Sequence, residues 1–190
     1  MKLYNKTKCP DAILEPLLVR AGRQIGVRTG GVIVKVTAGR SAACRGQAFE
    51  CSWVYVWHLR NLKSRRNGRA IETDCGYFAL SLPAPLVLGG ASSDALKCAE
   101  TFSSVARHEW GHIKDYQHGG TERLDWSKKT AAGRCAPHDL RPEEKRANRY
   151  SREAAEKIEA GKLQTADDDI LALAIWMEEN VKPPNPKVNQ

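Results

Sequence analysis

The sequence predicts an α+β fold in which one small sheet packs against helices. Segments rich in β-branched and aromatic residues, bounded by turn-forming residues, occupy the first half of the chain. Amphipathic segments with apolar residues at helical spacing lie before them and after them. The 190 residues, 42% of them hydrophobic, are enough for one sizeable core. We therefore expect a single domain over 1–181, followed by a flexible, proline-rich tail over 182–190.

The N-terminal half is expected to supply one helix and the sheet. A helix is predicted over 11–26, because apolar residues recur there at helical spacing between Pro10 and a closing glycine. Strands are predicted over 32–36, 49–57 and 76–82, where β-branched and aromatic residues cluster. We expect these segments to form one sheet of three strands or more.

The C-terminal half is expected to supply three helices. A long helix begins near Ser93, whose side chain can cap the first free amides, and ends near Gly119. A polar connection leads to a charged helix that starts at Pro142 and ends near 160. Acidic residues at 167–169 open the last helix, since they suit the positive end of its dipole.

Composition limits the compartment. No stretch reaches the roughly 18 consecutive apolar residues of a membrane span, and the N-terminal residues lack the apolar region of a signal peptide. A cytoplasmic protein with no membrane partner is expected. The six cysteines include no Cys-x-x-Cys pair, so we expect reduced thiols rather than a zinc ribbon or a redox motif.

The net charge of +8 is concentrated in two groups, one at 60–69 and one at 141–152. Such charge attracts polyanions without identifying one. For the first group, a solvated loop is the simpler interpretation, and contact with nucleic acid or an acidic protein is the alternative.

The pentapeptide at 108–112 carries the strongest chemical signal. It reads His-Glu-Trp-Gly-His within the predicted long helix. Residues four apart on a helix differ by only about 40° in direction, so His108 and His112 can offer two imidazole nitrogens to one cation. Glu109, about 100° round from His108, borders the same surface and can act as a general base toward water on a zinc ion. The motif therefore predicts a Zn²⁺ site with Glu109 as the catalytic residue.

A catalytic zinc site with an open position for water needs a third protein ligand. Glu144 is preferred, because it lies in the next predicted helix, beyond a connection long enough to fold back. Its neighbour Glu143 and His138 in the connection are alternatives. His118 lies ten residues after His108, a spacing used by another zinc motif. On a continuous helix, however, it points away by about 80°.

Further polar residues lie near the motif. Asp115 falls within about 20° of the His108 direction, where it either orients a ligand histidine or is a surface acid. Stabilisation of the oxyanion in peptide hydrolysis falls to a donor near the metal. Tyr116, Tyr150 and His138 are the candidates for that role.

The segment 144–148 reads Glu-Lys-Arg-Ala-Asn, and the motif helix continues through Asp115 and Tyr116. Over about 76–151 the chain resembles the compact zincin-fold peptidases of the ImmA/IrrE type, whose second motif reads Glu-x-x-Ala-Asn. It is also similar to metallopeptidases of bacteria and phages whose motif helix reads His-Glu-x-x-His-x-x-Asp-Tyr. The chain departs from the ImmA/IrrE type after the second motif, where Tyr-Ser-Arg-Glu at 150–153 replaces a Leu-Leu-Met-Pro-like run.

The resemblance implies a zincin-like fold of the gluzincin class, with Glu144 as the third zinc ligand. In such folds the last strand before the motif helix is often the sheet edge that pairs with an extended peptide. By this analogy the strand at 76–82 is expected to bind the substrate.

Two functions are expected from different classes. The first is a zinc-dependent peptidase that hydrolyses peptide bonds of a protein or peptide substrate. The second is a catalytically inactive, metal-containing module that binds nucleic acid or an acidic protein through the basic loop at 60–69. Glu109 favours the enzyme, because a purely structural metal site does not need a carboxylate beside its first ligand. The sequence predicts neither the cleavage specificity nor the oligomeric state.

Overall fold

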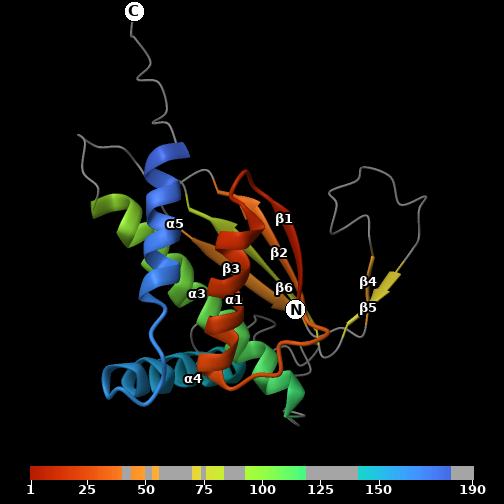
Figure 1. Cartoon of the computed structure of the whole chain (residues 1–190). Helices are drawn as coiled ribbons and strands as arrows, with labels where there is room; N and C mark the ends of the chain where they lie inside the picture. The colour runs from red at the N-terminus through yellow and green to blue at the C-terminus, as the bar shows by residue number, and fades with distance from the viewer. Residues whose placement is uncertain are drawn as a thin grey trace, which may run out of the picture.

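The structure, a computed structural model, describes residues 1–39, 44–49, 53–55, 70–73, 76–83, 93–118 and 141–180. Within these ranges the fold is α+β, with four helices and a small four-stranded sheet (Figure 1). The helices are α1 (Asp11–Ile25), α3 (Ser93–Gln117), α4 (Pro142–Glu159) and α5 (Asp167–Asn180). The strands are β1 (Lys2–Lys6), β2 (Ile33–Ala38), β3 (Arg45–Phe49), β4 (Trp53–Tyr55), β5 (Ala70–Glu72) and β6 (Tyr77–Leu82).

The four-stranded sheet has the order β1-β2-β6-β3. Strands β1, β2 and β6 are parallel, and β3 alone runs antiparallel to its neighbour β6. Strand β6 is therefore an inner strand, with β2 on one side and β3 on the other. The expectation that 76–82 forms the sheet edge is wrong, and within the described residues the edge on that side is β3.

Two further strand predictions need correction. The predicted strand at 49–57 is not one strand, because β3 ends at Phe49 and β4 pairs antiparallel with β5 in a separate two-stranded sheet. Strand β1 was not predicted, because its sequence Lys-Leu-Tyr-Asn-Lys is short and largely polar. It pairs in register with β2 from Lys2 to Lys6.

The helices cover one face of the four-stranded sheet. Alternate residues of β2 and β6 point to this face, as expected for the two-residue period of a strand: Val34, Val36, Phe78 and Leu80. They are buried in a core that they share with α1, α3 and α5. The intervening residues Ile33 and Tyr77 pack on the opposite face, away from these helices. None of the described helices is long and apolar enough to cross a bilayer.

Trp110, the middle residue of the pentapeptide, fixes the orientation of α3. Its side chain is fully buried, and its indole Nε1 donates a hydrogen bond of 2.8 Å to the carbonyl oxygen of Leu18 in α1. Its ring meets that of Phe78 edge-on, with 4.9 Å between centroids. A Cβ atom at Gly22 would lie 3.0 Å from its Cε2 atom, so a glycine in α1 makes room for it. The core therefore holds the motif helix by Trp110.

Several predictions fall on segments outside the described residues. These are the basic loop at 60–69, the polar connection that contains His138, and the tail at 182–190. Cys9, Cys44 and Cys98, which lie within the described ranges, are free thiols.

Candidate metal centre

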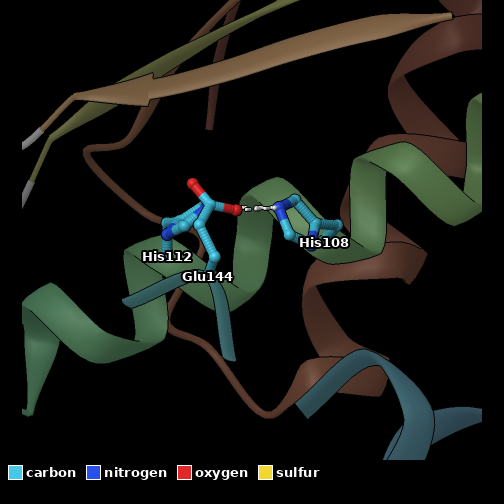
Figure 2. A group of neighbouring side chains, drawn as sticks. All are labelled: His108, His112 and Glu144. Carbon is cyan, nitrogen blue, oxygen red and sulfur yellow. Dashed lines mark hydrogen bonds and ion pairs between the residues drawn. The ribbon is translucent and has the colours of Figure 1, made fainter. Parts of the chain in front are cut away.

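Helix α3 presents His108 and His112 one turn apart, and the first turn of α4 presents Glu144 against them (Figure 2). The two Nε2 atoms are 3.2 Å apart. Glu144 Oε2 lies 3.1 Å from Nε2 of His108 and 3.5 Å from Nε2 of His112. The three ligand atoms all lie within 4.8 Å of one another, so these residues can together hold a metal ion.

The surroundings of these three residues suit a bound cation. His112 and Glu144 are only 6% and 7% exposed. Burying an ionised carboxylate is costly unless a positive charge or strong hydrogen bonds compensate it. Two imidazole nitrogens and one carboxylate oxygen are also donors that divalent transition metals accept. The donor set therefore fits a metal, although these donors alone do not identify it.

A close approach of α3 and α4 brings Glu144 to the histidines. A Cβ atom at Gly111 would lie 2.9 Å from Cα and 3.0 Å from the carbonyl oxygen of Ala147. Such distances are shorter than normal contacts with backbone atoms, so the two helices can approach this closely only with glycine at 111. Ala147 lies about one helical turn after Glu144. The Gly111–Ala147 contact therefore sets the position of Glu144.

A second contact between the helices lies one turn further along α3. Asp115 is 6% exposed and accepts two hydrogen bonds of 2.7 Å from Nε and Nη2 of Arg146. Paired N–H donors matched to a carboxylate fix orientation as well as distance. Both interpretations of Asp115 from the sequence are therefore wrong: it is buried, and its printed partner is Arg146 rather than a ligand histidine.

Replacing Gly111 with alanine is expected to weaken metal binding by at least about tenfold, the effect typical of lost support for a ligand. The added Cβ atom meets the backbone of α4, so the helix must move and take Glu144 with it. A titration of the purified protein with zinc against a chromogenic chelator measures the change.

The matched control is Gly30→Ala, because a Cβ atom at Gly30 meets nothing within 4 Å. It should bind zinc as the parent does. Parent affinity in the Gly111→Ala protein would show that the close helix contact does not position the site.

Glu109 lies beneath the edge strand β3. It is 4% exposed, and a Cβ atom at Gly46 would lie 2.6 Å from its Cγ and 2.7 Å from its Cδ. Its Oε2 atom is buried without a hydrogen-bond partner among the described residues. Burial, and then the negative charge of Glu144, raise the pKa of Glu109 to about 8. A cation held by the three ligand residues would oppose this rise, because positive charge favours the carboxylate.

These residues line one pocket of about 190 Å³. Its walls come from β3, α3 and the start of α4: Gly46, Gln47, Ala48, His108, Glu109, His112, Tyr116, Arg141, Glu143 and Glu144. The pocket therefore combines three metal-ligating side chains, a separate buried carboxylate, and two side chains that can donate hydrogen bonds to an anion, Tyr116 and Arg141.

The alternative ligands and donors have different places. His118 is exposed at the end of α3, outside the pocket lining and outside the ligand group. Glu143 lines the pocket but does not belong to the ligand group found among the described residues. Of the expected oxyanion donors, Tyr116 lines the pocket, whereas the ring of Tyr150 lies 4.6 Å from the Lys114 ammonium and packs against the core.

Arg141 was not predicted as a site residue. The sequence placed it only within a basic group, but it directly precedes Pro142 at the start of α4. The same helix start carries Glu144 to the ligand group, so Arg141 is brought to the pocket with it.

Comparisons of the chain with protein families, with curated proteins and with solved structures found no match. The resemblance to zincin-fold peptidases therefore stays a prediction from the motifs.

Proposed function

We propose that the protein is a zinc-dependent peptidase with a zincin-like fold, in which His108, His112 and Glu144 hold the metal. The observation that carries the proposal is the convergence of the three ligand atoms within 4.8 Å, with Glu109 in the same pocket. Two histidines and a glutamate, with a fourth position left for water, form a ligand set that catalytic zinc sites use. A purely structural zinc site is normally closed by four protein ligands.

In this proposal each polar residue of the pocket has a task. Zinc would supply a Lewis acid and lower the pKa of a water molecule toward neutrality. Glu109 takes a proton from the water that attacks the peptide carbonyl and passes it to the departing amine. Tyr116 and Arg141 donate hydrogen bonds to the negative charge that develops on the carbonyl oxygen. Both lie in the pocket from which such donation is possible.

We propose further that the substrate binds along β3 rather than along 76–82. An edge strand offers unpaired backbone amides and carbonyls, and an extended peptide can add to it as a further strand. Gly46 of β3 touches Glu109, so a peptide beside this strand would run next to the catalytic carboxylate. Gly46 and Gln47 are exposed, which leaves this part of the strand accessible.

Removal of the metal tests this function. The zinc-loaded protein is incubated with a mixture of unstructured peptides, and the products are identified by mass spectrometry. Cleavage should stop after dialysis against a zinc chelator and return when zinc is added, because the pocket then regains the group that activates water. Cleavage that continues in the metal-free protein would contradict the proposal.

The binding-module function depends on the basic loop at 60–69, which lies outside the described residues. No contact of the described residues favours it over the peptidase.

A further inference from the structure

Glu143 is a pocket carboxylate for which the proposed reaction has no task. It lies in the first turn of α4, directly before Glu144, and lines the same pocket. Both of its carboxylate oxygens are buried, and neither has a hydrogen-bond partner among the described residues. An ionised carboxylate in this condition is costly, because it has lost water without gaining a partner.

The other carboxylates in this region are compensated or used. Asp115 is paired with Arg146 through two hydrogen bonds. Glu144 lies against the two histidines, and Glu109 has the role of general base. Glu143 alone among these four acids has neither a partner within the described residues nor a task in the reaction.

The charges around the pocket point to the kind of partner that Glu143 lacks. The lining side chains include three carboxylates, those of Glu109, Glu143 and Glu144, and one guanidinium, that of Arg141. A dication held with Glu144 balances much of the remaining negative charge near the histidines. The Glu143 carboxylate is then the acid to which an additional cation would bring a charge-assisted hydrogen bond.

We propose that Glu143 binds a cationic group of the substrate, an ammonium or a guanidinium, close to the bond that is cleaved. The inference rests on the proposed function, since it assigns a specificity to the same site. The cation has two possible sources with the same chemistry: the free N-terminal amine of a peptide, or the side chain of a lysine or arginine next to the cleaved bond. Glu143 is adjacent to the ligand Glu144, so either group would be held beside the reacting carbonyl.

An acidic residue in the first turn of a helix also stabilises that helix through its dipole, without any ligand. This role needs no access to a pocket and would not affect the choice of substrate. The two roles therefore differ in their readout: a dipole role changes the melting temperature, whereas a binding role changes selectivity.

The test compares peptides that differ only in a cation. One pair carries lysine or the neutral norleucine beside the cleaved bond, and another carries arginine or the neutral citrulline. Each is prepared with a free and with an acetylated N-terminus. The parent protein should show a kcat/KM at least about tenfold higher for the cationic member, a preference of about 1.4 kcal/mol. In Glu143→Gln this ratio should fall to about one, since the amide no longer attracts a cation.

Acetylation identifies the source of the cation. A preference that survives acetylation belongs to the side chain, and one that disappears belongs to the N-terminal amine. The matched control is Glu156→Gln, which removes an acid from the exposed side of the same helix and should keep the parent ratio. An unchanged ratio in Glu143→Gln, or equal rates for both members of each pair in the parent, would overturn the inference.

A binding measurement separates this inference from the proposed function. Calorimetric titration of the same peptides into Glu109→Gln and into the Glu109→Gln, Glu143→Gln double variant needs no hydrolysis. Tighter binding of the cationic peptides that is lost in the double variant supports the role of Glu143, even if the parent cleaves no peptide. Cleavage without a cationic preference would instead leave the peptidase standing and refute the Glu143 assignment alone.

Discussion

Replacing Glu109 with glutamine is expected to lower kcat/KM for peptide hydrolysis by a factor of about 10²–10⁴, the usual contribution of a general base. The amide keeps the size of the side chain but cannot take a proton from water. Glu109 is not among the three ligand residues, so the zinc content should stay at the parent level. Steady-state kinetics and elemental analysis of the same preparation check both statements.

The control for this substitution is Glu100→Gln, which changes an exposed acid on the same helix and should leave the rate unchanged. Hydrolysis by Glu109→Gln at the parent rate would show that the mechanism is wrong. Loss of zinc together with activity would instead assign Glu109 to the metal rather than to proton transfer.

Replacing Glu144 with alanine is expected to lower zinc affinity by more than about 100-fold, since even the loss of a group that supports a ligand costs about 10–100-fold. The variant keeps two imidazole donors but loses the carboxylate that lies 3.1 Å and 3.5 Å from them. Competition with a chromogenic chelator measures the affinity. The chelator must bind zinc tightly enough to report both proteins.

Glu143→Gln is the control for this second substitution, because it changes the neighbouring acid outside the ligand group. It should bind zinc as the parent does. Retained affinity in Glu144→Ala would move the third ligand to Glu143, His138 or His118. Lost affinity in Glu143→Gln would select Glu143 among these.

The helices could be predicted closely from the sequence because their signals are local. The first helix begins at Asp11 as expected, and the three later helices begin at Ser93, Pro142 and Asp167 as expected. In each case a turn former, a capping residue or acidic residues mark the start, and apolar spacing marks the extent.

The sheet could be predicted only in part, because strand pairing is not local. The strands β2 and β6 lie within about one or two residues of the predicted segments. Neither the inner place of β6 nor the reversed direction of β3 can be read from a segment's own composition, since both depend on partners far along the chain. The polar strand β1 was missed for the same reason: its pairing with β2 comes from the fold rather than from its residues.

The candidate site divides in the same way. His108 and His112 follow from spacing on one helix. Glu144 lies 36 residues from His108, and its arrival depends on the Gly111–Ala147 contact and the Asp115–Arg146 pair. Motif resemblance selected Glu144 without either contact. The contact of Glu109 with β3 and the pocket positions of Arg141 and Glu143 were not predicted, because each is a meeting of separate elements.

The most direct test of the central claim is the metal content of the purified protein, measured by elemental analysis beside that of His112→Ala. His112 is chosen because its Nε2 lies close to both other ligand residues. The account predicts about one zinc ion per chain in the parent, as in a single catalytic site, and its loss in the variant. Zinc absent from the parent after equilibration with the metal, or equal amounts in both proteins, would contradict it.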